Sequence, residues 1–245
     1  MELLIGIVGK PSSGKTTFLN AACLTSAKVG SYPFTTIKPN PGVAYVRSTC
    51  PSIELGLTPN PQNSFCINGL RFIPVDLLDV AGLVPGAWEG KGLGNQFLDD
   101  LCRADALIHV VDVSGSLDST GHEVDTGTWD PSKDVEFLQH EISMWLLDII
   151  KRDFRRIVGR VEAEKEDLSM IMAEKLSGLA ITRNQVSLSI QKSGLDKKKP
   201  SQWSDQDILQ FTKVLQKIAK PMIIAANKID RPAAKEWLKS LEKES

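Results

Sequence analysis

The segment Gly9–Thr16, GKPSSGKT, fits the pattern GxxxxGK[ST], and it restricts the fold more than any other feature of the chain. An apolar run of strand length, Leu3–Val8, comes directly before it, and a helical pattern, Thr16–Thr25, follows. A glycine-rich turn between a buried parallel strand and a helix is the setting that a phosphate-binding loop requires. We therefore predict such a loop; the alternative is a plain glycine turn with an exposed lysine.

This loop predicts a site for the phosphates of a nucleotide. Backbone N–H groups of residues 12–16 can surround a β-phosphate, and the helix N-terminus adds the positive end of its dipole. The Lys15 ammonium can reach the β- and γ-phosphates, and the Thr16 hydroxyl can ligate Mg²⁺. The loop residues predicted to contact the nucleotide are Gly9, Lys10, Pro11, Ser12, Ser13, Gly14, Lys15, Thr16 and Thr17.

The segment NKID, Asn227–Asp230, follows an apolar strand pattern at 222–226 and indicates how a base could be read. The Asp230 carboxylate can accept hydrogen bonds from the N1–H and the exocyclic amine of guanine, whereas adenine would leave that buried carboxylate unpaired. Asn227 can contact the base edge and the phosphate loop, and the Lys228 alkyl chain can lie over the ring. The pattern predicts guanine nucleotides, GTP and GDP; the alternative is a turn in which Asp230 caps a helix.

Two further segments are typical of loops that sense a γ-phosphate. In DVAG, Asp79 supplies a carboxylate on the Mg²⁺ side, through water, and Gly82 supplies a backbone N–H for the γ-phosphate. In YPFTTIKPN, Thr35 or Thr36 should close over the metal, and Thr36 is favoured; the alternative is an ordinary polar loop. The predicted metal ligands are Thr16, Thr36 and Asp79.

Strand and helix patterns alternate along the chain, except in a mostly helical block at about 134–218. This order predicts an α/β fold, a doubly wound domain with a helical insertion. Within it, 30–42 is predicted as a loop and 48–70 as irregular, because both are rich in proline. The other expected strands lie at 43–47, 71–80, 106–113 and 222–227, and 114–133 is expected as a loop. Helices are expected at 93–104, 135–161, 163–177 and the C-terminal end, with more helical structure between 184 and 219 that is broken at Lys197–Pro200.

Composition narrows the function classes. The chain has 245 residues, a formal net charge of −1 and a sequence pI of about 6.3, so as a whole it is no generic polyanion binder. No apolar run approaches the ~18 residues of a membrane span, and the start lacks signal-peptide features, which predicts a cytoplasmic protein without membrane contact. The 4 cysteines form no CxxC pair. Reduced thiols are predicted, with a disulfide or metal pair of Cys50 and Cys66 as the alternative.

Together these motifs resemble the Obg-related GTPases, specifically the YchF/Obg-like ATPase branch. The similar pieces cover roughly 1–115 and 220–245: GKPSSGKTT, YPFTTIKPNPG, DVAGLVPGAWEGKGLGNQFLDDLCRADALIHVVD and NKID. The resemblance implies a P-loop NTPase fold of the Ras-like G-domain type, formed by 1–133 and 219–245, with a coiled-coil-like helical insertion at 134–218. It also implies slow GTP hydrolysis with Mg²⁺ and association with ribosomes or translation factors.

Three features depart from this branch. Its ATPases usually end the base-reading motif in Glu, so Asp230 favours GTP over ATP. Many relatives carry Asn where this chain has Ser12, a residue linked to a potassium ion in some related GTPases, so potassium dependence is not predicted. The last strand of the G domain, its base-supporting loop and the C-terminal TGS domain have no counterpart after NKID, and we expect the chain to be a fragment.

The group that orients the attacking water is an open question in the sequence. The position after Gly82 often carries a glutamine in nucleotide switches, and here it is Leu83, as in related GTPases that hydrolyse slowly or use a group from elsewhere or from a partner. His109 matches a strand histidine implicated in catalysis in the YchF branch; the alternative is a histidine packed within the sheet. The predicted catalytic residues are therefore Lys15, Thr36, Gly82 and His109.

The resulting function hypothesis is a slow GTP-hydrolysing switch. The alternatives are an ATPase of the Obg-like type and a nucleotide-binding scaffold without turnover. The ribosome or RNA could be contacted by basic residues of the helical block or by the expected C-terminal part that has no counterpart after NKID. In the helical block acidic residues interleave, so a solvated helix face is the alternative. These basic residues are Lys151, Arg152, Arg155, Arg156, Arg160, Lys197, Lys198 and Lys199.

Overall fold

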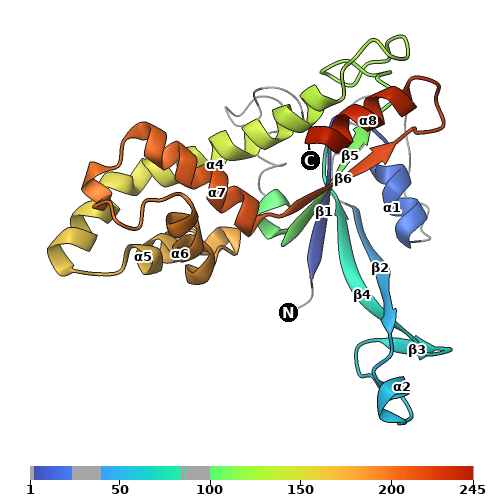
Figure 1. Ribbon diagram of the computed structural model, residues 1–245, viewed down its shortest axis with the longest axis horizontal. Coiled ribbons are helices and arrows are strands. Elements are labelled where there is room, and N and C mark those ends of the chain that lie inside the picture. The colour runs from blue at the N-terminus through green and yellow to red at the C-terminus, as the bar shows by residue number, and fades with distance from the viewer. Residues whose placement is uncertain (1–2, 24–39, 84–85, 87–99, 245) are drawn as a thin grey trace.

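The structure is a computed structural model, and it describes residues 3–23, 40–83, 86 and 100–244. A twisted sheet forms its centre, and a helical arm projects from it (Figure 1). The strands of this described part are β1 Leu4–Val8, β2 Asn40–Thr49, β3 Phe65–Ile67, β4 Leu70–Asp79, β5 Ala106–Asp112 and β6 Met222–Asn227.

The sheet has the order β2–β4–β1–β5–β6, with β3 beside β4. β1 pairs in parallel with β4 and β5, and β5 pairs in parallel with β6, whereas β2 is antiparallel to β4. The carboxyl ends of the parallel strands therefore meet at one edge, which is where ligands bind in open α/β sheets. The residues that end these strands are Val8, Asp79, Asp112 and Asn227.

Helices cover both faces of the sheet. The α-helices described over their full length are α1 Lys15–Cys23, α2 Ser52–Leu55, α4 Ser132–Glu164, α5 Leu168–Lys175, α6 Arg183–Lys192, α7 Asp205–Ala219 and α8 Ala234–Glu244. Because alternate residues of a strand point to opposite faces, the two sides of β5 show which helix lies where. Val110 packs with Leu19 of α1, whereas Leu107 packs with Leu138 of α4. This arrangement confirms the predicted doubly wound α/β fold.

The arm has a hydrophobic core of its own, built from α4, α5, α6 and α7. Its fully buried side chains include Phe211, Leu215 and Val186, each 0% exposed. The Trp203 ring lies between Phe154 and Phe211, with ring centroids 5.6 and 5.5 Å apart. Arm and sheet share α4, which runs from one to the other (Figure 1). The block 134–218 is thus helical as predicted, and its status as a separate insertion domain stays a prediction.

Within the arm, the helix boundaries differ from the predicted ones. The helix expected at 163–177 is interrupted, because α4 continues to Glu164 and Lys165 then takes a left-handed φ of 54°. α5 starts only at Leu168, with the Asp167 side chain accepting a hydrogen bond from the Ser169 N–H. A short 3₁₀ turn at Pro200–Gln202 separates α6 from α7, where the sequence predicted a break near Pro200. No helix in the described ranges is both long and apolar enough to span a membrane.

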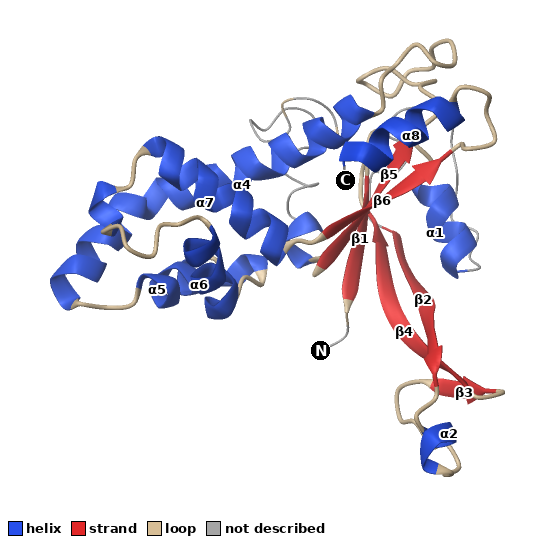
Figure 2. Cartoon of the chain, in the orientation of Figure 1, coloured by secondary structure: helices blue, strands red, loops and turns tan. Residues whose placement is uncertain are grey.

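Two loop predictions near the N-terminal half are wrong in part. Residues 40–42 begin β2, and 48–70 contains the end of β2, α2, β3 and the first residue of β4. Here β2, β3 and β4 extend from the sheet as an antiparallel ribbon (Figure 2). Pro41 has no N–H to donate, but it is compatible with β2 because this strand lies at the sheet edge and pairs on one side only. The expected helix 93–104 is described only from residue 100, and 100–103 are helical.

Candidate nucleotide-binding site

The loop between β1 and α1 has the backbone of a phosphate cradle. Gly9, Ser12 and Gly14 take positive φ values of 146°, 59° and 100°. A Cβ on Gly14 would lie 2.1 Å from Asn227 Nδ2, so only glycine allows the approach of these two segments. The buried hydroxyls of Ser12 and Ser13 have no hydrogen-bond partner within the described part of the chain. The loop therefore has unused donors beside the edge where the strands end.

Lys15 is buried in this loop, and its Nζ donates to the Lys10 carbonyl at 3.0 Å. Desolvation lowers the pKa of this ammonium to about 8, although the charge of Asp79 opposes the shift. A buried cation of this kind gains from a nearby negative charge. The position is compatible with the role predicted for Lys15, which is to contact phosphate oxygens.

A pair of hard oxygen donors lies beside Lys15. The Thr16 hydroxyl donates to Asp79 Oδ2 at 2.5 Å, and the Asp79 carboxylate is 0% exposed. Mg²⁺ is usually held by one or two protein oxygens together with substrate phosphates and water. Thr16 and Asp79 fit that donor set, whereas Thr35 and Thr36 lie outside the described residues.

The segment after Asp79 follows the phosphate loop closely. The Leu83 N–H donates to the Gly9 carbonyl at 3.2 Å, and a Cβ on Gly82 would lie 2.8 Å from the Pro11 nitrogen. Leu83 is 1% exposed and packs in the cluster that contains Leu138 of α4. Leu83 is thus a core residue, which agrees with the expectation that it does not orient water.

His109 lies on β5 beneath the start of the loop. Its Cδ2 would be 3.5 Å from a Cβ on Gly9, and the residue is 1% exposed. Burial lowers the pKa of the imidazole to about 3, and the charges of Lys15 and Lys10 act in the same direction. The ring is therefore neutral at physiological pH. Its Nδ1 has no hydrogen-bond partner among the described residues.

The NKID segment contacts the phosphate loop directly. Asn227 Nδ2 donates to the Ser13 carbonyl at 2.8 Å. Lys228 takes a φ of 61°, and its Nζ forms an ion pair with Asp112 at 3.0 Å. Asp230 is exposed, whereas the sequence argument assumed a buried carboxylate. The Asp230 carboxylate would be shielded from water only when a base is bound.

The sequence did not single out Asp112 as a site residue. Its carboxylate is 0% exposed and accepts hydrogen bonds from the Ser114 and Ser116 hydroxyls at 2.5 and 2.8 Å. Burial alone would raise the pKa of Asp112, but the Ser114 hydrogen bond and the Lys228 charge outweigh it and lower the pKa. The signal was present, because Asp112 ends an apolar strand as Asp79 does. Asp112 fixes Lys228, and so the NKID turn.

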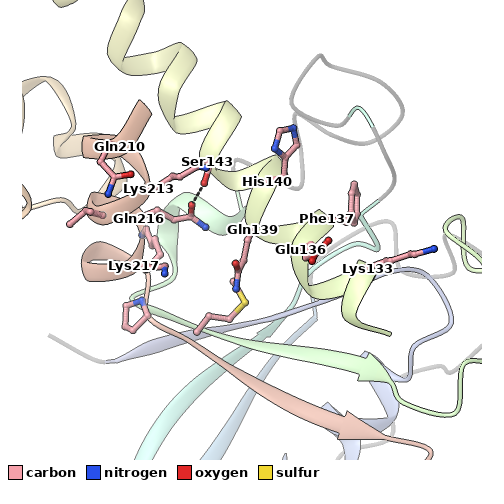
Figure 3. A pocket seen from close by; sticks show the side chains of 14 residues that line it. Lys133, Glu136, Phe137, Gln139, His140, Ser143, Gln210, Lys213, Gln216 and Lys217 are labelled. Carbon is pink, nitrogen blue, oxygen red and sulfur yellow. Dashed lines mark hydrogen bonds between the residues drawn. The ribbon is translucent and has the colours of Figure 1, made fainter. Parts of the chain in front are cut away.

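A separate hollow of about 1020 Å³ lies at the base of the arm, between α4 and α7 (Figure 3). Its exposed charged lining consists of Lys133 from α4 and Lys213 and Lys217 from α7, against one carboxylate, Glu136. None of these residues belongs to the phosphate loop or NKID. The hollow is therefore a distinct, positively charged surface.

Comparison with known proteins identifies the family. The family described as 50S ribosome-binding GTPase matches residues 4–150. The chain belongs to this family. Among the relatives, an uncharacterised GTP-binding protein of Methanocaldococcus jannaschii is 48% identical over 98% of this chain and 60% of its own length. The ribosome-binding ATPase YchF of Bacillus subtilis is 30% identical over 93% of this chain and 55% of its own length.

A solved structure supports the same grouping. The crystal structure of a GTP-binding protein from Pyrococcus horikoshii OT3 matches with a TM-score of 0.78 and 38% identity, over 100% of this chain and 62% of that one. The family member described here thus spans about 60% of the length of its relatives. The predicted kinship with the YchF branch and the P-loop GTPase fold are confirmed.

Proposed function

We propose that the chain is the nucleotide-binding part of a YchF-type GTPase that binds GTP and GDP and hydrolyses GTP slowly. The observation that carries this proposal is the 2.8 Å hydrogen bond from Asn227 Nδ2 to the Ser13 carbonyl. It holds a base-reading segment against a phosphate-binding loop, although the two are far apart in the sequence. A nucleotide is the ligand with a base and phosphates at that spacing.

In this proposal the amides of residues 12–16 and the Lys15 ammonium bind the phosphates, and the Gly82 N–H donates to the γ-phosphate. Thr16, Asp79 through water, and Thr36 from outside the described residues would hold Mg²⁺, which when bound would neutralise charge on the phosphate oxygens. Leu83 is buried in the core and has no polar group with which to orient the attacking water. A neutral His109 ring has one hydrogen-bond donor and one acceptor. If a conformational change must first bring this ring to the attacking water, hydrolysis is slow.

Guanine is the proposed base because Asp230 stands at the end of NKID. The ATPase alternative has support of its own, since the Bacillus subtilis relative is described as an ATPase. Titration calorimetry with Mg²⁺ and either GTP or ATP separates the two. We expect GTP to bind at least about tenfold more tightly, a difference of ~1.4 kcal/mol. Equal affinities would favour the ATPase.

Turnover separates a GTPase from a scaffold that binds nucleotide without hydrolysis. Single-turnover assays with excess protein over GTP report the chemical step directly. We expect complete but slow conversion to GDP and phosphate, abolished in Lys15→Ala. Bound GTP that stays intact for as long as the protein is stable would indicate the scaffold.

Ribosome association is the second part of the proposal. It is supported by the family description, by the name of the Bacillus subtilis relative and by the positive hollow between α4 and α7. Most basic residues further along the arm are less suited, because several already pair with carboxylates, as Arg152 does with Asp148 at 2.6 Å and Lys151 does with Asp205 at 2.9 Å. A cytoplasmic location follows from this proposal and stays a prediction.

Co-sedimentation with ribosomes at several salt concentrations tests this surface. We expect the double variant Lys213→Glu, Lys217→Glu to weaken ribosome binding, because two cations that could contact RNA phosphates are replaced by carboxylates, which the phosphates repel. Lys192→Glu is the control, since Lys192 is an exposed lysine of α6 that does not line the hollow. If the parent, the double variant and the control all co-sediment with ribosomes equally, the ribosome contact lies elsewhere.

A further inference from the structure

The second residue of the phosphate loop points away from the proposed phosphates. The Lys10 side chain is 3% exposed, and its Nζ lies 2.7 Å from Asp134 Oδ2. The same ammonium donates to the Leu117 carbonyl at 2.9 Å and lies 5.2 Å from the centre of the Trp129 ring. Lys15 already supplies the cation of the nucleotide site, so Lys10 has a different task.

Asp134 connects this lysine to the arm. It stands in the first turn of α4, a helix of 33 residues that continues into the arm. Its Oδ1 accepts a hydrogen bond from Trp129 Nε1 at 2.9 Å, and its side chain is 6% exposed. Because Oδ1 accepts this hydrogen bond, Oδ2 forms the ion pair with Lys10 and water is largely excluded, a rotation of α4 at this end would break charged contacts with the phosphate loop.

A second link joins α4 to the segment that follows Gly82. The Gly86 N–H donates to Glu141 Oε1 at 2.9 Å, and Glu141 is 3% exposed. Leu83 packs with Leu138 and Ile142 on the same stretch of α4. One helix is therefore attached at two points, once to the phosphate loop and once to the segment proposed to contact the γ-phosphate.

We propose that α4 couples the nucleotide state to the arm through the Lys10–Asp134 ion pair and the Gly86–Glu141 hydrogen bond. Lys10 is then a positioning residue that acts through α4. The proposal rests on the nucleotide site proposed above. A γ-phosphate that draws in Gly82 shifts the neighbouring attachment at Glu141, while Lys10 keeps the first turn fixed to the loop. If the nucleotide changes the affinity of the arm for a partner by some factor, linkage requires that the bound partner changes the affinity for the nucleotide by the same factor.

Hydrogen exchange in the arm tests this coupling. Exchange is measured for peptides covering 168–192, which lie outside the nucleotide site, with saturating Mg²⁺ and either GDP or the non-hydrolysable analogue guanosine 5′-(β,γ-imido)triphosphate. We expect the two nucleotides to change exchange rates there by about fivefold or more in the parent protein. In the double variant Lys10→Met, Asp134→Leu, which leaves neither charge unpaired, this difference should disappear.

Two further variants keep the test decisive. Glu141→Ala, which removes the second attachment, should also reduce the difference, and it provides the answer if the double variant does not fold. Lys151→Met is the control, because it breaks a Lys–Asp pair that lies within the arm, and it should retain the difference. A parent protein that binds both nucleotides without any difference in the arm overturns the coupling, as does a difference that survives in both Lys10→Met, Asp134→Leu and Glu141→Ala. Absence of nucleotide binding in the parent would instead contradict the proposed function.

Discussion

At the scale of single residues, Lys15 makes nucleotide binding depend on pH. Its pKa in the free protein is lowered to about 8, and bound phosphates favour the charged form. We therefore expect GTP affinity to be constant below about pH 8 and to fall above it, because binding must then take up a proton. Calorimetry in buffers of different ionisation enthalpy measures that uptake. Affinity that is flat up to about pH 10, where an unperturbed lysine titrates, would contradict this prediction.

Leu83 is expected to matter for stability more than for chemistry. Leu83→Ala leaves a cavity between the sheet and α4, and such truncations cost about 2–5 kcal/mol of unfolding free energy. Single-turnover hydrolysis should stay within about tenfold, a barrier change of ~1.4 kcal/mol or less. Leu83→Met, which nearly conserves volume, is the control for the unfolding measurement. A much larger loss of rate in a folded Leu83→Ala protein would give this side chain a catalytic role.

His109 is the residue for which rate and affinity should separate. Because its pKa is lowered to about 3, its protonation produces no inflection in the rate profile near neutral pH. If its contact forms only in the transition state, His109→Ala lowers kcat by more than about tenfold with GTP affinity nearly unchanged. Single-turnover assays after a check of folding by circular dichroism decide this. An unchanged rate removes His109 from the mechanism.

At the scale of elements, the ribbon of β2, β3 and β4 brings two thiols together. Cys50 and Cys66 Sγ lie 3.0 Å apart, and all 4 cysteines are free thiols. Mild hydrogen peroxide should join this pair, each thiol losing one hydrogen as the peroxide becomes two waters. Closing a loop of about 15 residues stabilises by ~3 kcal/mol in the chain-entropy view.

Thiol counting and thermal unfolding test whether peroxide joins Cys50 and Cys66. The oxidised protein should lose the Cys50 and Cys66 thiols and unfold at a higher temperature, and Cys66→Ser should show neither change. Oxidation that occurs at Cys23 or Cys102 instead would contradict the assignment of the pair.

The same elements show what sequence patterns can predict. β1 and β5 were expected from their apolar runs, because strands inside a parallel sheet are covered on both faces. β6 was also expected from its apolar run, although it lies at the sheet edge and its Ile223 is 66% exposed. β3 was missed because its apolar side chains are exposed, as Phe65 at 41% and Ile67 at 54% are. The ends of β2 were missed because 40–42 and 48–49 carry polar residues, a proline and a glycine instead of an apolar pattern. The break after Glu164 depends on a left-handed Lys165, for which no local signal was recognised.

At the scale of the whole molecule, motifs predicted the parts of the site, and the fold shows how they meet. The phosphate loop, Asp79 and NKID each carry a local pattern, so their convergence at one sheet edge followed from parallel strand order. The attachment of Lys10 to Asp134 could not be predicted, because neither residue has a pattern that names its partner. Likewise, the net charge of −1 left a local basic patch possible but gave no position for it, whereas the hollow between α4 and α7 gathers lysines from two helices that are far apart in the sequence.

We propose that Asp230 reads guanine beside the phosphate loop, and one substitution at this residue tests that role most directly. Asp230→Asn replaces an acceptor with an amide that can donate to the second carbonyl of xanthine. Calorimetry with Mg²⁺ and either GTP or xanthosine triphosphate should show a reversal of preference by at least about a hundredfold, within the ~10⁴ that paired hydrogen bonds can supply. Asp196→Asn, at an exposed position in the arm, should keep the parent preference. An Asp230→Asn protein that still prefers GTP as strongly as the parent would contradict the claim.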